Sequence, residues 1–180
     1  MFIYLKSINF LLISLIVILL NGCSSTNMKD FENKTPKLNL FEFFKGETVA
    51  YGIFEDRFGK LRRQFRVKIK GSVEENILTL DEKFIYDDGE KATRIWKIKK
   101  INENKNLIKY EGSADDVEGL ATGTSVGNAL NWTYDIYLNI KGSNLKVKFN
   151  DWIYKQDSNV AINRAYVSKF GIDIGSVTRS

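Results

Sequence analysis

The sequence predicts an all-β domain that folds as an antiparallel, up-and-down barrel of about eight to ten strands. Apolar and polar residues alternate through most of residues 47–178, which is the period of strands with one face in water. Short turns rich in Gly, Asp and Asn separate the alternating segments and join antiparallel neighbours. A meander of this length removes its edges best by closing, and the alternative is a strongly curved open or double sheet.

The start of the chain predicts an export signal over residues 1–22. One cation, Lys6, precedes an apolar run over 10–20 that is shorter than the roughly 20 residues needed to span a bilayer. The single cysteine, Cys23, closes the stretch Leu-Leu-Asn-Gly-Cys. This stretch resembles a bacterial lipoprotein box, in which the signal is cleaved and the cysteine is acylated, for example with palmitate. The alternatives are a plain signal peptide with a chance cysteine and an uncleaved anchor helix.

The rest of the chain divides into residues 23–36, a lipid anchor with a polar tether, and residues 37–180, a single β-barrel domain. The cysteine is followed by Ser24 rather than by Asp, which in enteric-type bacteria favours the outer membrane. We therefore expect a protein that lipid holds in the outer membrane, facing the periplasm. An amphipathic stretch over 38–44 predicts one or two helical turns that plug one end of the barrel.

The first half of the domain predicts five strands. Residues 47–54 alternate and end at an Asp-Arg-Phe-Gly turn, and residues 61–70 alternate strictly and end at a Gly-Ser pair. Residues 77–86 precede Asp-Asp-Gly, which is a strong hairpin signal. Residues 93–101 lead through a polar turn to the short strand 107–111.

The second half predicts the remaining strands. Residues 114–128 form a weaker, glycine-rich segment, and residues 132–140 alternate cleanly up to a Lys-Gly-Ser-Asn turn. Residues 145–154, 160–170 and 172–178 close the chain. The polar faces carry many Lys and Arg, which argues against an apolar band facing lipid. We expect a lipocalin-like (calycin-type) barrel, whose interior side chains fill or one small ligand occupies.

Composition excludes several function classes. The chain has no His and one Cys, which excludes Ser-His-Asp and Cys-His catalysis, His-based zinc sites and disulfides. We expect no metal and no cofactor. The net charge of +5 is modest and interleaved with acids, so nucleic acid is not an expected partner, and we expect a monomer. The basic polar faces are expected to contact either solvent or anionic lipid head groups.

Charges stand among the apolar residues of five predicted strands. Because side chains alternate across a strand, the inward face follows from counting, and a slip of one residue reverses it. The predicted inward charges are Arg63, Glu82, Arg94, Asp151 and Arg164. A lone buried charge is very costly, so these groups must pair, meet water or meet a ligand.

Two interpretations of these charges stay open. They tie strands together as buried ion pairs, or they line a cavity in which an arginine binds an anionic head group. The three arginines outnumber the two acids, which predicts one free cation. The aromatic residues expected to line such a cavity are Phe84, Trp96, Tyr134 and Phe149. A glycosidase-like pair of Glu82 and Asp151 has no support beyond a shared face, so we expect no catalytic residues.

Several stretches together resemble one family. They are Thr-Pro-Lys-Leu at 35–38, Phe-Phe-Lys-Gly at 43–46, Tyr51-Gly52, Asp-Arg-Phe-Gly at 56–59, Arg62-Arg63 with Phe65, Leu80 to Glu90, Arg94 with Trp96, Ala-Thr-Gly at 121–123, Gly127 to Trp132, Asp-Trp-Ile-Tyr at 151–154, Asn-Arg-Ala at 163–165 and Ser-Lys-Phe-Gly at 168–171. This combination resembles the proteobacterial lipoprotein family catalogued as domain of unknown function 3833, over nearly the whole mature chain. The resemblance implies an outer-membrane lipoprotein with a lipocalin-like barrel and supplies no catalytic residues. Its motif residues include five inward positions, Glu82, Arg94, Trp96, Asp151 and Arg164.

These inferences predict a non-catalytic binding module. The expected ligand is a small hydrophobic or amphipathic anion, such as a fatty acid or a lipid fragment. The alternative is a structural or interaction lipoprotein, with a filled barrel that presents its surface to envelope partners.

Overall fold

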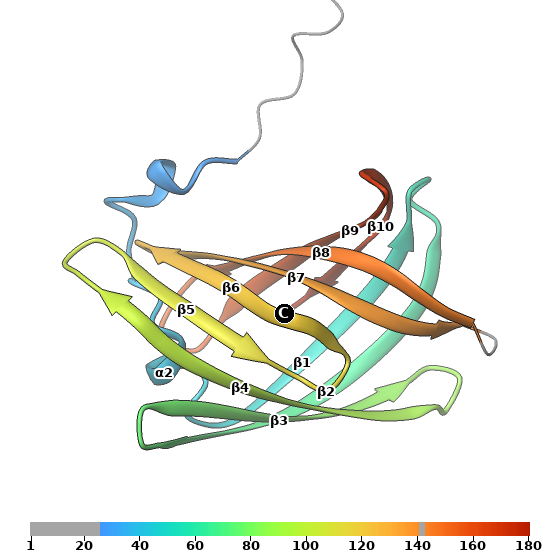
Figure 1. The fold of residues 1–180 in the computed structure, drawn as a ribbon, viewed down its shortest axis with the longest axis horizontal. Helices are drawn as coiled ribbons and strands as arrows, with labels where there is room; N and C mark the ends of the chain where they lie inside the picture. The colour runs from blue at the N-terminus through green and yellow to red at the C-terminus, as the bar shows by residue number, and fades with distance from the viewer. Residues whose placement is uncertain (1–25, 141–142) are drawn as a thin grey trace, which may run out of the picture.

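The computed structural model describes residues 26–140 and 143–180, whose ten strands close into an antiparallel barrel (Figure 1). Each strand pairs with its neighbours in sequence, and the first strand pairs with the last, so the predicted all-β, up-and-down barrel is confirmed. The strands are β1 (Gly46–Asp56), β2 (Leu61–Glu74), β3 (Ile77–Tyr86), β4 (Lys91–Glu103), β5 (Ile108–Ser113), β6 (Val117–Val126), β7 (Ala129–Ile140), β8 (Ser143–Lys155), β9 (Ala161–Lys169) and β10 (Ile172–Arg179).

The predicted signal peptide and the lipidation site, Cys23, lie outside the described residues. Within the described ranges, the model contains no helix with the length and apolarity that a bilayer span requires.

The turn after β2 differs from the prediction. The Gly-Ser pair at 71–72 lies inside β2, and the hairpin turns at Glu75 and Asn76, both with positive φ. This strand position requires a glycine because the backbone carbonyl of Phe44 occupies the space that a Cβ would need. The glycine therefore marks a close approach of the N-terminal segment to the sheet.

The helix α2 (Leu40–Phe43) lies at one end of the barrel, as the amphipathic stretch predicts (Figure 1). Leu38 and Leu40 are buried in the core. The backbone N–H of Leu40 donates to the hydroxyl of Tyr110, 3.3 Å away, and the hydroxyl of Ser125 donates to the carbonyl of Leu38. Because apolar packing and hydrogen bonds both hold the segment, α2 closes this end of the interior.

A short 3₁₀ helix, η1 (Met28–Phe31), packs on the outside of the barrel at the same end (Figure 1). The Phe31 ring lies 6.0 Å from the ring of Trp152 and 5.7 Å from that of Tyr154, measured between centroids. Trp152 is only 7% exposed although it faces outward from β8. The tether residues nearest the domain therefore lie against the barrel wall.

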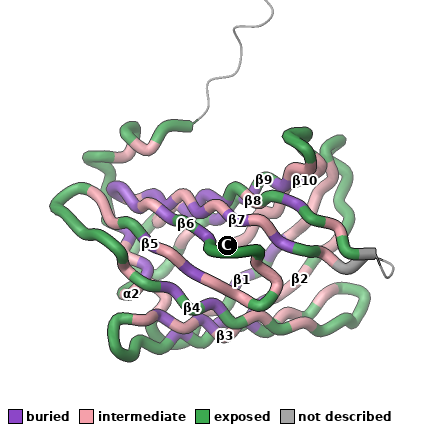
Figure 2. The backbone as a smooth tube through the Cα atoms, in the orientation of Figure 1, coloured by how far each residue is buried: buried purple, intermediate pink, exposed green. Residues whose placement is uncertain are grey.

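Buried and exposed residues alternate along the strands (Figure 2). The buried set includes large apolar side chains from β2 to β8, such as Ile69, Leu80, Trp96, Trp132 and Val147. The outward positions of β2 are mainly Arg and Lys. The apolar positions of these strands therefore face the interior, as their alternation predicts.

Candidate functional site

The barrel encloses a cavity of about 560 Å³. Its wall is mostly apolar, and its size falls within the roughly 300–1,000 Å³ typical of small-molecule sites. Leu40 and Phe43 of α2, with Phe44 directly after it, contribute to the closed end. The interior is thus not fully packed.

Aromatic side chains form much of the wall. The ring of Trp96 meets the ring of Tyr134 edge-on at 5.2 Å, and Tyr134 stacks on Phe149 at 5.3 Å. Phe84 packs against Phe65 with centroids 5.9 Å apart. The four aromatic residues that the sequence places in a cavity, Phe84, Trp96, Tyr134 and Phe149, all line this one.

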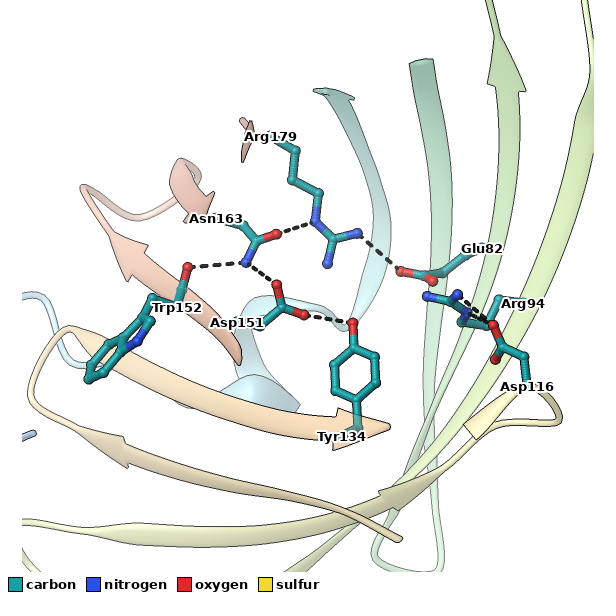
Figure 3. Close-up of polar contacts among 8 residues, drawn as sticks. All are labelled: Glu82, Arg94, Asp116, Tyr134, Asp151, Trp152, Asn163 and Arg179. Carbon is teal, nitrogen blue, oxygen red and sulfur yellow. Dashed lines mark hydrogen bonds and ion pairs between the residues drawn. The ribbon is translucent and has the colours of Figure 1, made fainter. Parts of the chain in front are cut away.

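Seven polar residues lie together on the cavity wall, and we call them the polar cluster (Figure 3). They are Glu82 on β3, Arg94 on β4, Asp116 before β6, Tyr134 on β7, Asp151 on β8, Asn163 on β9 and Arg179 on β10.

Asp151 is the centre of one half of the polar cluster. One of its oxygens accepts a hydrogen bond from the hydroxyl of Tyr134 at 2.8 Å, and the other accepts from the amide of Asn163 at 3.2 Å. The Asn163 amide also donates to the carbonyl of Trp152, and its oxygen accepts from Nε of Arg179 at 2.7 Å. Asp151 is 4% exposed, yet both of its oxygens have partners, which is what a buried carboxylate requires.

Glu82 is less well satisfied. Its Oε1 lies 3.7 Å from Nη1 of Arg179, which is an ion-pair distance but too long for a hydrogen bond. Its Oε2 is buried and has no hydrogen-bond partner among the described residues. Glu82 also stands opposite Arg94 in the β3–β4 ladder, while Arg94 itself donates twice to Asp116, at 2.6 and 3.0 Å. The cluster therefore presents an open acceptor beside two guanidinium groups.

Burial shifts the pKa values of the polar cluster. Burial raises the pKa of Glu82, although Arg179 and Arg94 attract its charged form. Burial also raises the pKa of Tyr134 well above its usual range, and the neighbouring Asp151 adds to the shift. Burial therefore opposes the charged form of Glu82, while the two neighbouring arginines stabilise it.

Glu82 is expected to make stability depend on pH. An unfolded Glu titrates near 4.5, so its raised folded pKa contributes stability that is complete below pH 4.5 and is lost as the pH rises through the folded value. Each unit between the two pKa values costs up to about 1.4 kcal/mol. Glu82→Gln removes this titration, so the free energy of unfolding of the native protein should fall relative to that of Glu82→Gln between pH 4.5 and 7. Urea denaturation of both proteins measures the difference, and a constant or growing advantage of the native protein would contradict the shift.

Arg63 lies at the rim of the cavity, away from the polar cluster. Its guanidinium binds Asp88 at 2.8 Å and Glu90 at 2.6 Å in the β3–β4 hairpin, and it lies 3.6 Å from the ring centroid of Tyr86. Two carboxylates already neutralise this arginine. Arg63 lines the cavity mouth, but its guanidinium is already paired with the two hairpin carboxylates.

The prediction that Arg164 faces inward is wrong. Arg164 is exposed and lies over the outer face of Tyr166, and the inward neighbour is Asn163, which is 5% exposed. The reason is that β9 carries apolar residues on both faces. Ile162 stands outside, opposite Tyr154, while the inner positions hold small residues such as Ala165.

Arg179, Asn163 and Asp116 are cluster residues that the sequence analysis did not identify. Arg179 lies two residues past Val177 on the inward face of β10, so continuing the predicted strand by one residue would have included it. Asp116 lies in a turn, where alternation gives no signal. These additions also overturn the predicted surplus of arginines, because the cavity wall holds Arg63, Arg94 and Arg179 against Glu82, Asp116 and Asp151.

Comparison with known proteins identifies a family. Neither a curated protein nor a solved structure matches the chain. A family model described as Protein of unknown function (DUF3833) matches residues 17–180, which is most of the sequence and the whole barrel. The chain therefore belongs to the DUF3833 family, as its motifs predict.

Proposed function

We propose that this protein is a lipid-anchored barrel of the cell envelope that binds one amphipathic, lipid-like molecule without chemical conversion. The observation that carries the proposal is the apolar cavity of about 560 Å³ with one concentrated polar cluster in its wall. Binding sites of this class combine apolar walls with a few placed polar groups. An acyl chain suits the apolar part, and a small polar head suits the cluster.

The polar cluster fits a carboxylate head group. Arg179 gives one hydrogen bond to Asn163 and has only a long contact with Glu82, so its guanidinium is the cation least committed to protein partners in the cluster. Burial raises the pKa of Glu82, which lessens the repulsion between its carboxyl group and an incoming carboxylate. A fatty acid carboxylate would therefore meet Arg179 as an ion pair.

A non-catalytic role follows from how the acids are held. Tyr134 and Asn163 occupy both oxygens of Asp151, and Arg94 holds Asp116. Asp151, one acid of the Glu82–Asp151 pair that glycoside hydrolysis would use, therefore has no free oxygen. We propose a monomer that meets the membrane and a lipid-like molecule and does not bind nucleic acid.

One observation favours a second candidate function. The guanidinium groups of Arg94 and Arg179 each lie within 4.0 Å of a carboxylate, so the polar cluster could also serve as a structural network inside a barrel that acts through its surface. The two functions differ in whether the cavity takes up a ligand.

Titration with cis-parinaric acid tests the binding proposal. Trp96 and Trp132 line the cavity, so excitation of tryptophan should transfer energy to a fatty acid bound there. We expect saturable, one-to-one binding, and weaker binding of the methyl ester, which has the same chain without the anion. The structural barrel would be favoured if the energy-transfer fluorescence rose without saturation and unlabelled fatty acid did not displace the probe.

Replacement of Cys23 tests the proposed anchor in the outer membrane. A Cys23→Ala variant lacks the acylation site and should leave the membrane fraction, since acyl chains bind at about 0.8 kcal/mol per buried methylene. Fractionation of cells with a Ser25→Ala variant as the control measures the effect. A Cys23→Ala protein that remained membrane-bound after a salt wash would count against lipid as the sole anchor.

A further inference from the structure

The barrel wall has a gap near α2. The ladder between β10 and β9 ends at Arg179, opposite Asn163. Pairing with β1 ends one residue later, where the backbones of Ser180 and Tyr51 exchange two hydrogen bonds. Beyond this point, neither β1 nor β9 has a strand partner on the facing side among the described residues. We call the space between Gly46–Ala50 and Asn159–Ile162 the β1–β9 gap.

The cavity reaches the outside through the β1–β9 gap. Residues from both of its sides contribute to the cavity wall, namely Thr48, Val49, Ala50, Asn159, Val160 and Ala161. Val49 is 47% exposed and Val160 is 42% exposed. Because the same residues line the cavity and face solvent, the cavity opens here.

Exposed apolar side chains surround this opening. Val49 and Tyr51 project outward from β1, and Val160 and Ile162 stand on the other side of the gap, with Tyr51 64% exposed. Apolar groups gathered on the surface of a soluble domain are typical of a site that meets a membrane or a partner.

Cations flank the apolar residues on both sides. Arg66 and Lys68 stand beside Tyr51 and Val49 in the β1–β2 ladder, and Arg164 follows on β9. The acid nearest on the β9 side, Asp157, accepts hydrogen bonds from the backbone of its own turn. Glu47, on the same outward face of β1, stands opposite Lys70. The cations around these apolar groups therefore outnumber the acids, which suits a bilayer with anionic head groups.

The tether reaches the barrel next to this gap. Phe31 packs on Tyr154, which pairs with Ile162 on the neighbouring strand, so η1 lies one strand away from the opening. Cys23 precedes Phe31 by eight residues, which span at most about 28 Å. A lipid at Cys23 would hold this side of the barrel close to the membrane.

We propose that the β1–β9 gap rests on the phospholipid bilayer and is the opening through which a lipid-like molecule passes between the membrane and the cavity. The proposal rests on the lipid-binding function proposed above and adds the route by which the molecule enters and leaves the cavity. An amphipathic molecule could then move with its chain leading into the apolar wall, without crossing water.

Spin labelling of the full-length lipoprotein tests the contact with the membrane. A nitroxide at Ile162→Cys is compared with one at Ile95→Cys, whose residue is 52% exposed on β4, in vesicles of phosphatidylethanolamine and phosphatidylglycerol. We expect accessibility to a water-soluble nickel complex to be at least about threefold lower at position 162, because apolar groups at an interface sink about 5–10 Å below the head groups. Equal accessibility at the two positions would overturn the proposal.

Transfer kinetics test the opening itself. An Ile162→Glu variant places a carboxylate against the anionic head groups and should slow uptake of a fluorescent fatty acid from the same vesicles at least about fivefold. Because Ile162 is 40% exposed and does not line the cavity, affinity in detergent solution should stay unchanged, and Ile95→Glu should transfer at the native rate. Native transfer by Ile162→Glu would overturn the opening. No uptake by the native protein, from vesicles or in detergent, would instead refute the binding function.

Discussion

An Ala165→Trp variant is expected to lose at least about tenfold in affinity for a fatty acid while the barrel still folds. Ala165 is 2% exposed, lines the cavity and stands beside Asp151 in the β8–β9 ladder. An indole at this position would occupy the space proposed for the ligand. Because the cavity is open here, the fold should tolerate the larger side chain at a cost of about 1–3 kcal/mol. Titration with cis-parinaric acid measures the affinity.

Tyr166→Trp is the matched control for this experiment. It places the same indole on the outer face of the same strand, where Tyr166 is 42% exposed. This variant should bind like the native protein. If Ala165→Trp folded and bound the fatty acid with native affinity, the ligand could not occupy the cavity.

An Arg94→Ala variant is expected to lose about 3 kcal/mol of unfolding free energy, at the lower end of the cost of breaking a buried ion pair. Arg94 is the cation that pairs with Asp116 and faces Glu82 across the β3–β4 ladder. Its side chain is 22% exposed and that of Glu82 is 3% exposed. Removal of Arg94 therefore leaves two acids in the wall with less compensation. Guanidinium denaturation measures the loss.

Arg62→Ala provides the comparison for Arg94→Ala. Arg62 pairs with Asp56 at 2.6 Å, but its side chain is 51% exposed. An exposed pair of this kind contributes about 1 kcal/mol or less. Equal losses for the two variants would show that solvent screens the Arg94 pair as it screens the Arg62 pair, and the polar cluster would not be a buried network.

Alternation was enough to predict the barrel. In β3 and β7 most apolar residues share one face, so the inward positions of Glu82 and Tyr134 follow from counting. In β9 the same reasoning failed at Arg164, because Ile162 and Tyr166 are apolar residues on the outer face. A pattern with apolar residues on both faces does not say which face is buried.

The polar cluster was predictable only in part. Asp151 and Arg94 interrupt apolar faces and are visible as exceptions in the sequence. Arg179 and Asp116 become cluster members through barrel closure, because pairing of β1 with β10 and the turn before β6 bring them to the same wall.

Native mass spectrometry of the lipid-anchored protein, extracted from membranes in mild detergent, tests the central claim most directly. The account predicts a folded species heavier than the acylated chain by one lipid-like molecule, with the excess lost on denaturation and absent from Ala165→Trp. The acylated chain alone, even after incubation with fatty acids and phospholipids in excess, would contradict a ligand-binding barrel and leave a structural one.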